Sequence, residues 1–147
     1  MDKIKVKKLS EGAVLPKRAT LGSAGYDLCA CIDAPVRIMP NEIKKINTGI
    51  AIEIPENNIV GLVYARSGIS SKFGIAPVNC VGVIDSDYRG ELIVPLINHS
   101  EKEYIINPLD RIAQLVFTPV FTPDVIEADE LSDTARGCGG FGSTGKK

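Results

Sequence analysis

Residues 82–91 read GVIDSDYRGE, and this segment places a carboxylate, Asp85, three residues before the aromatic ring of Tyr88. Apolar residues on both sides of the polar stretch predict a β-hairpin whose turn carries the two side chains. A carboxylate held at such a turn can act as a general base for water, and the ring beside it can pack against a flat substrate. A solvated turn without chemistry has the same pattern, so the segment alone leaves both interpretations open.

A second segment, residues 65–70, reads ARSGIS and combines a guanidinium, a hydroxyl and the start of a helical turn predicted over residues 67–72. The amide groups at a helix N-terminus attract anions, and an arginine beside them strengthens such a site. A capped turn with a surface arginine is the alternative, and this segment alone favours neither.

Two further segments carry polar side chains within strand-like sequence. In residues 24–28, Asp27 follows Gly25, which permits unusual backbone geometry beside the carboxylate. A turn that leads into a strand and is capped by Asp27 is the simpler interpretation. Residues 110–115 read DRIAQL and predict an ordinary strand. In a regular strand Arg111 and Gln114 lie on opposite faces.

The C-terminal segment is rich in glycine, because five of the ten residues of RGCGGFGSTG at positions 136–145 are glycine. Such composition favours a disordered tail, since ordering it costs much entropy and buries little. However, a cation, a ring and two hydroxyls suit a phosphorylated ligand with a flat base, so a flap that orders on binding is the alternative. The spacing of a P-loop is absent, which argues against a P-loop NTPase.

The elements that must position these residues are short strands. Hydrophobic residues alternate with small or polar ones, and Pro, Gly and Asn separate the runs, as in a β-sandwich, jelly roll or barrel. The only predicted helix is the turn at residues 67–72. The predicted strands cover residues 46–54, 59–65, 91–97, 103–106 and 111–118.

The bulk composition excludes several classes of function. The chain has 147 residues, enough for one domain, and its net charge of -1 argues against binding nucleic acid through bulk positive charge. No apolar run is long enough for a membrane span, and the first residues do not resemble a signal peptide, so we expect a cytoplasmic protein without membrane partners. Four cysteines without a C-x-x-C pair and a single histidine argue against zinc and favour free thiols: Cys29, Cys31, Cys80, Cys138 and His99.

Together and in this order, these segments resemble the trimeric deoxyuridine triphosphatase (dUTPase) family over roughly residues 20 to 145. GVIDSDYRGE and RGCGGFGSTG are the most specific parts, and RSG and RIAQ stand where the family has them. One departure is Ala65, where many members have proline, but this change removes no functional group. The resemblance implies an all-β jelly-roll (β-clip) domain over residues 1–134, a mobile arm over residues 135–147, and a homotrimer with shared active sites.

The implied function is hydrolysis of dUTP to dUMP and pyrophosphate, which keeps dUTP out of DNA and supplies dUMP for thymidylate synthesis. The resemblance makes Asp85 the catalytic base that activates water for attack on the α-phosphorus. It places Tyr88 beneath the deoxyribose, where the ring excludes a 2'-hydroxyl. It also implies Mg²⁺ held mainly by the phosphates, with Asp27 and Gln114 contacting the ion through water. The role of Arg111 stays open between catalysis and an ion pair with a carboxylate such as Asp110.

The remaining matches are contacts to the substrate. A uracil-reading segment accepts only one pattern of donors and acceptors, and it corresponds to Asn79, Gly82, Val83 and Ile84. The phosphate contacts correspond to Arg66, Ser67, Gly68 and Gln114. In the arm, Phe141 matches the ring that stacks on uracil, and the arm's other substrate contacts correspond to Arg136, Gly142, Ser143 and Thr144.

Two alternatives have the same fold. A dCTP deaminase needs a glutamate on the strand after the hairpin, where this chain has Pro95, and usually has Arg-Ser-Ser in the second segment. A non-catalytic regulatory protein is the other alternative, but a scaffold without activity should have lost Asp85 or the arm, and the sequence retains both. An assay for pyrophosphate release separates these classes.

Overall fold

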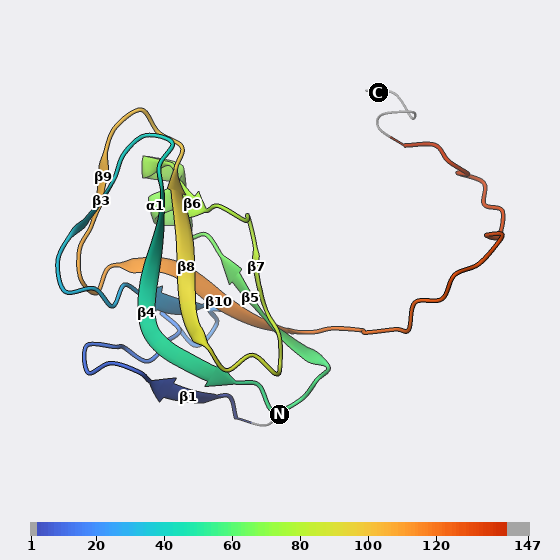
Figure 1. The fold of residues 1–147 in the computed structure, drawn as a ribbon, viewed down its shortest axis with the longest axis horizontal. Helices are drawn as coiled ribbons and strands as arrows, with labels where there is room; N and C mark the ends of the chain where they lie inside the picture. The colour runs from blue at the N-terminus through green and yellow to red at the C-terminus, as the bar shows by residue number, and fades with distance from the viewer. Residues whose placement is uncertain (1–2, 141–147) are drawn as a thin grey trace.

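The computed structural model describes residues 3–140, and this part of the chain is almost entirely antiparallel β-structure (Figure 1). The only helix among the described residues is short, and no helix there is long and apolar enough to cross a membrane. The elements are β1 (Lys5–Lys8), β2 (Tyr26–Cys29), β3 (Val36–Ile38), β4 (Ile43–Glu53), β5 (Ile59–Tyr64), α1 (Ser67–Phe73), β6 (Ile75–Pro77), β7 (Gly82–Ile84), β8 (Glu91–Asn98), β9 (Tyr104–Ile106) and β10 (Arg111–Pro119).

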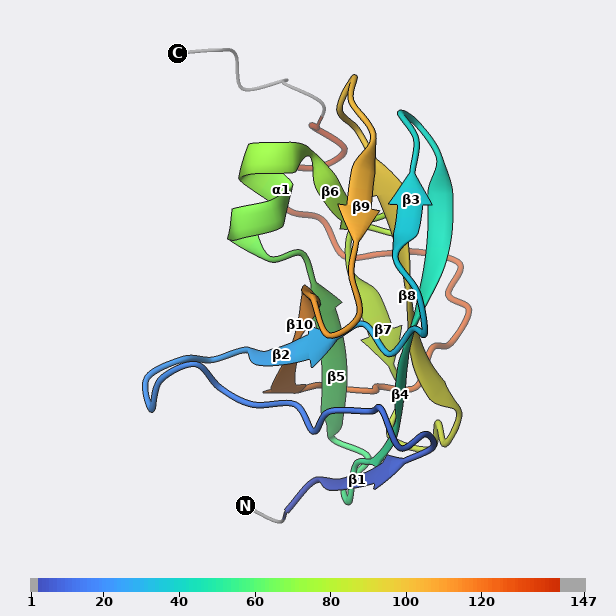
Figure 2. The ribbon, with the colours of Figure 1, turned by 90° about the vertical axis from the view of Figure 1, so that its left-hand side faces the viewer.

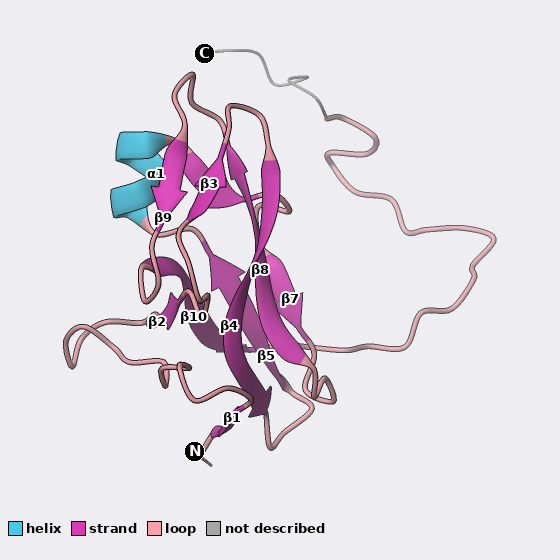
Figure 3. Ribbon diagram, turned by 60° about the vertical axis from the view of Figure 1, so that its left-hand side comes forward, coloured by secondary structure: helices cyan, strands magenta, loops and turns pink. Residues whose placement is uncertain are grey.

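The strands form two four-stranded sheets and one two-stranded sheet. The first, here the β4 sheet, has the order β1-β4-β8-β6, and the second, the β5 sheet, has the order β2-β10-β5-β7. From β4 to β8 the chain changes sheet at every strand, which is the connectivity of a jelly roll. Strands β3 and β9 form the small sheet, and α1 lies at the same end of the body (Figure 3). The predicted all-β jelly-roll class is confirmed.

The core lies between the sheets, and the period-two pattern creates it. Ile46 and Leu92 of the β4 sheet and Leu28 and Leu115 of the β5 sheet are all nearly inaccessible to solvent. Each such side chain contributes roughly 1.5–3 kcal/mol when it is fully buried. The strands predicted at residues 46–54, 59–65, 91–97, 103–106 and 111–118 are all present, and their ends either coincide with the prediction or differ from it by at most three residues.

The hairpin predicted around residues 82–91 is wrong. Strand β7 pairs with β5, whereas β8 pairs with β4 and β6, so the polar turn connects two sheets and not two paired strands. The apolar runs on both sides of the turn are real, but they belong to opposite layers of the sandwich. The turn therefore lies at an edge of the body, where Asp85 and Tyr88 are exposed.

After β10 the chain leaves the body as an extension, residues 120–140, that contains neither helix nor strand (Figure 1). Large apolar side chains project from it: Phe121 is 94% exposed and Val125 is 95% exposed, and Ile126 and Leu131 are exposed as well. The body of the same chain covers none of these side chains. Apolar side chains displayed together in this way are typical of a surface that contacts another molecule.

Candidate active site

Asp27 is the centre of a cluster of charged residues at one edge of the β5 sheet. Its Oδ1 accepts a hydrogen bond from Arg66 Nε at 2.7 Å, and its Oδ2 accepts one from Arg111 Nη1 at 3.1 Å. The Asp27 side chain is only 17% exposed. One carboxylate thus holds two guanidinium groups in fixed places, and the cluster keeps an excess of positive charge that attracts anions.

Strand β10 delivers Arg111 to this cluster through an irregularity. The register between β10 and β2 shifts between Arg111 and Ala113, so Gln114 comes to lie opposite Asp27. The prediction that Arg111 and Gln114 serve opposite faces assumed a regular strand and is wrong, because the extra residue brings both to the neighbourhood of Asp27. Arg111 forms an ion pair with a carboxylate, as one of its two possible roles required, but the partner is Asp27 and not Asp110.

A small pocket of about 150 Å³ opens beside this cluster. The side-chain amide of Gln114 donates to the carbonyl of Ala65 at 2.9 Å, which orients its oxygen. That oxygen, Oε1, occupies the space of a missing Cβ, because a Cβ at Gly25 would stand 2.3 Å from it. Guanidinium, hydroxyl and amide groups line the pocket, and these are the groups that bind phosphate oxygens. The lining residues are Ala19, Ser23, Gly25, Asp27, Arg66, Ser67 and Gln114.

Helix α1 begins beside this pocket, as the sequence predicted. Arg66 is the residue before the first helical turn, and no side chain caps the helix N-terminus. The first turn contains no acidic residue. A Cβ at Gly68 would meet no atom within 4 Å, so the space beside this backbone is open. Arg66, Ser67 and Gly68 therefore face an accessible and electropositive region.

A second group of candidate residues lies on β7 and the turn that follows it. On one side β7 pairs with β5, and among the described residues its other side carries no ladder, so Gly82, Val83 and Ile84 present backbone donors and acceptors at a sheet edge. Asn79 is next to this edge, with Nδ2 3.6 Å from where a Cβ of Gly82 would be. Free strand edges bind flat or extended ligands through their backbone.

The turn itself is tightly built. The amide of Tyr88 donates to the carbonyl of Asp85 at 3.1 Å, which closes a four-residue turn. Arg89 Nη1 donates to the carbonyl of Ser86 at 2.7 Å, and the Tyr88 hydroxyl donates to the carbonyl of Glu91 at 3.0 Å. These hydrogen bonds hold the turn in one conformation, and both Asp85 and Tyr88 are exposed on it.

These two groups are far apart within one chain. The β5 sheet places β2 and β7 at opposite edges, with β10 and β5 between them (Figure 2). Three strand spacings amount to about 14 Å, and the register puts Asp85 four residues along the strands from Asp27, or about 13 Å. The two backbones are therefore about 20 Å apart, measured on this strand geometry. One chain therefore does not bring Asp85 and the pocket beside Asp27 together.

The arm is only partly described. Arg136 is exposed and donates to the carbonyl of Gly139 at 2.8 Å. The predicted substrate contacts Phe141, Gly142, Ser143 and Thr144 lie outside the described residues.

All four cysteines are free thiols, as the sequence predicted. Burial raises the pKa of the Cys29 thiol, and the negative charge of Asp27 nearby raises it further.

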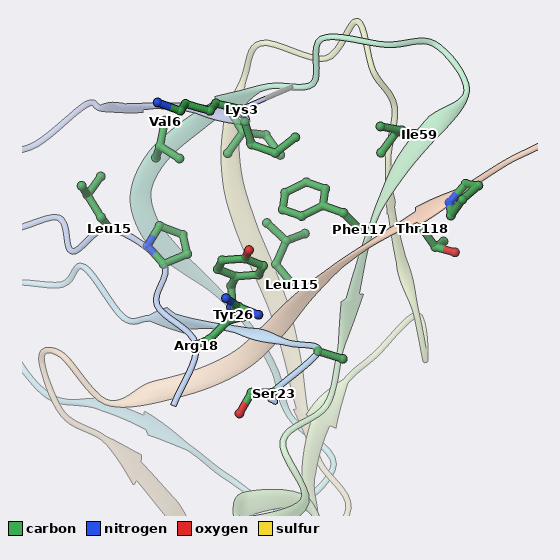
Figure 4. A pocket seen from close by; sticks show the side chains of 15 residues that line it. Lys3, Val6, Leu15, Arg18, Ser23, Tyr26, Ile59, Leu115, Phe117 and Thr118 are labelled. Carbon is green, nitrogen blue, oxygen red and sulfur yellow. The ribbon is translucent and has the colours of Figure 1, made fainter. Parts of the chain in front are cut away.

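A larger pocket of about 580 Å³ is not the candidate site (Figure 4). It lies between β1 and β10 and is lined mainly by apolar side chains such as Leu115 and Phe117. Tyr26 packs edge-on against Phe117 at a centroid distance of 5.9 Å, and the Arg18 guanidinium lies 5.8 Å from the centre of the Tyr26 ring. None of the candidate residues lines this pocket.

Sequence reasoning missed two residues that line the smaller pocket, Ala19 and Ser23. Nothing in the sequence of their loop distinguishes them from other small residues.

Comparison with known proteins identifies the family. The dUTPase family model matches residues 11–145. The chain is 50% identical to the deoxyuridine 5'-triphosphate nucleotidohydrolase of Desulfitobacterium hafniense (strain DSM 10664 / DCB-2), over 99% of both chains. Its structure resembles that of the Staphylococcus bacteriophage 80alpha dUTPase with dUPNHPP, with a TM-score of 0.89, 33% identity and 99% of both chains covered. It also resembles a variant dUTPase from phage phi11 of S. aureus described with a structural Mg(II) ion, with a TM-score of 0.80, 30% identity, and 90% of this chain and 100% of that chain covered. The chain belongs to the dUTPase family and is a hydrolase.

Proposed function

We propose that the protein hydrolyses dUTP to dUMP and pyrophosphate, with Asp85 as the base. Asp85 accepts a proton from water while the water oxygen forms a bond to the α-phosphorus, and the bond from that phosphorus to the pyrophosphate oxygen breaks. The observation that carries this proposal is the small pocket in which Asp27 fixes Arg66 beside Gln114, while its other oxygen holds Arg111 next to the pocket. The exposed turn that carries Asp85 supplies the other group that the reaction needs, the carboxylate that accepts a proton from water.

The phosphates bind at the first group of residues. Arg66 and Ser67 line the pocket, and Gly68 leaves its backbone accessible to a phosphate. Asp27 stabilises this arrangement by holding Arg66 and Arg111, so Arg111 takes part through its ion pair. Preorganised cations of this kind stabilise the charge that develops on the phosphates in the transition state.

The base and the sugar bind at the second group. The free edge of β7, Gly82 to Ile84, together with Asn79, reads uracil through backbone donors and acceptors. The Tyr88 ring lies beneath the deoxyribose and leaves no space for a 2'-hydroxyl. A cytosine presents the wrong pattern of donors and acceptors to the same edge and leaves groups unpaired.

Mg²⁺ is the proposed cofactor, and the residues fit an ion that arrives with the substrate. The described residues contain no group of three or more His, Cys, Asp or Glu side chains that could hold a metal. Gln114 Oε1 stands in the space left open at Gly25, and it and Asp27 would contact the ion through water. A bound Mg²⁺ would neutralise part of the triphosphate charge and polarise its oxygens.

A homotrimer with shared active sites is the proposed assembly. The separation of about 20 Å between Asp27 and Asp85 within one chain supports a site to which a second copy supplies one of the two groups. The exposed apolar side chains of the extension, such as Phe121 and Val125, favour its packing on another copy. The extension would carry the arm to a neighbouring site, where Phe141 stacks on uracil and Arg136, Gly142, Ser143 and Thr144 contact the substrate.

In the cell, this activity would keep dUTP out of DNA and supply dUMP for thymidylate synthesis. We propose that it acts in the cytoplasm, without nucleic-acid or membrane partners. A deaminase is disfavoured because Pro95 on β8 has no ionisable group to move a proton.

The test is release of pyrophosphate from dUTP, compared with dCTP, UTP and dTTP under the same conditions with Mg²⁺. We expect dUTP to be hydrolysed with a kcat/KM well above that of the other three. Equal rates with all four nucleotides, or ammonia release from dCTP, would show that the proposed function is wrong.

A further inference from the structure

The ring of Tyr88 lies directly over the backbone of Gly90. A Cβ at Gly90 would stand 2.3 Å from the Tyr88 hydroxyl oxygen, 2.5 Å from Cζ and 2.9 Å from Cε2. Heavy atoms in contact are separated by about 3.5 Å or more, so no side chain fits at position 90 while the ring is in place. The absence of a side chain at Gly90 therefore sets how deep the ring lies.

Backbone conformation does not require this glycine. Among the described glycines, only Gly49, Gly74 and Gly137 have a positive φ, so the backbone at position 90 accepts an ordinary residue. The reason for glycine at this position is the space that the Tyr88 ring occupies. A substitution there consequently acts on the ring and leaves the conformation of the turn unstrained.

The ring is the part that would move. Tyr88 is 43% exposed, and its hydroxyl is held by a single hydrogen bond to the carbonyl of Glu91 at 3.0 Å. Gly90 blocks one side of the ring, so an alanine would displace it by about 1 Å toward the solvent side and break that bond. The contact lies in the turn before β8 and reaches only the first residue of that strand, Glu91, so we expect the fold to be retained.

We propose that Gly90 is a specificity-determining residue, because it fixes the position of the Tyr88 ring against the sugar. This inference rests on the proposed role of Tyr88 in the site. The ring selects deoxyribose by shape, and a shift of about 1 Å in a positioning group is enough to change binding and turnover strongly. With Ala at position 90 the ring protrudes into the space of the sugar, which weakens dUTP binding and does not admit UTP.

The experiment introduces Gly90→Ala into three backgrounds: the natural chain, Tyr88→Phe and Tyr88→Ala. We expect the KM for dUTP to rise about tenfold in the first two backgrounds, because both retain a ring that meets the new Cβ. In the Tyr88→Ala background the same substitution should leave KM unchanged, since no ring is present. Gly22→Ala is the matched control, because a Cβ there meets no atom within 4 Å and its φ is not positive.

Two results would overturn the inference. One is an unchanged KM for Gly90→Ala in the natural chain. The other is an equal rise in all three backgrounds, which would show that Gly90 acts through the backbone. A crystal structure of Gly90→Ala tests the ring position without any assay: a ring still bonded to the carbonyl of Glu91 refutes the inference even if the chain hydrolyses dUTP. Failure of the proposed function would appear separately, as absence of dUTP hydrolysis by the natural chain.

Discussion

The separation between the phosphate pocket and Asp85 can be tested by mixing two inactive variants. Asp85→Asn removes the proton acceptor and keeps the shape, and we expect it to lose about two to four orders of magnitude in turnover. Arg66→Gln removes the charge beside the pocket, while its amide can still donate to Asp27. The two substituted residues lie on either side of the gap of about 20 Å.

The size of the recovery follows from how a site is assembled. If each site takes Asp85 from one chain and Arg66 from another, random trimers refolded from equal amounts contain complete sites with a frequency of about one quarter. The recovered activity should be greatest when the two variants are mixed in equal amounts. It should fall by the same amount whether the first or the second variant is in excess. If one chain supplied both residues, no mixture would contain a complete site.

The assay is pyrophosphate release from dUTP after co-refolding, with the mixed trimers counted by native mass spectrometry. The control is the natural chain refolded with an equal amount of the doubly substituted chain. Shared sites predict about one quarter of the activity of the natural trimer, whereas sites made by one chain predict about one half. No recovery in the first mixture, with mixed trimers present, would refute the reasoning from strand register.

Three further changes test other parts of the site. Tyr88→Ala should raise UTP hydrolysis relative to dUTP and Tyr88→Phe should not, because the bulk of the ring excludes the hydroxyl; equal ratios of kcat/KM in both variants would contradict the steric account. Truncation after Ala135 should leave the melting temperature nearly unchanged, because the described residues beyond it are mostly exposed, but it should lower turnover steeply; a large loss of melting temperature would show a structural role. Iodoacetamide at about pH 8 should modify the exposed Cys80 and Cys138 before Cys29, since the raised pKa of Cys29 leaves less of the reactive thiolate at that pH. Peptide mass spectrometry measures this order, and Cys29 reacting first would contradict it.

The sequence predicted those parts of the fold that depend on alternation. Strands β5 and β8 bury alternate residues, and burial of one face favours the period-two pattern that predicts them. It did not predict which sheet each strand joins. For this reason the sequence pattern predicts a hairpin at Asp85, although the two flanking strands lie in different layers.

The candidate site could also be predicted only in part. The types of its residues were visible in short motifs, but the bonds from Asp27 to Arg66 and Arg111 join residues 39 and 84 positions apart. The irregular register of β10 that makes the second bond leaves no signature in residues 110–115. The sequence likewise shows Gly90 as part of a motif without showing its role. A Cβ at position 90 would clash with the Tyr88 ring, and only the structure shows where that ring lies.

The extension after β10 also has a consequence for the lifetime of a single copy. Proteases bind their substrates as extended backbone, and a segment without helix or strand that displays Phe121 and Leu131 needs no unfolding to enter such a cleft. A copy packed against partners would have this segment covered, whereas a copy without partners would offer it continuously. Proteolysis of this segment would therefore discriminate between assembled and unassembled chains.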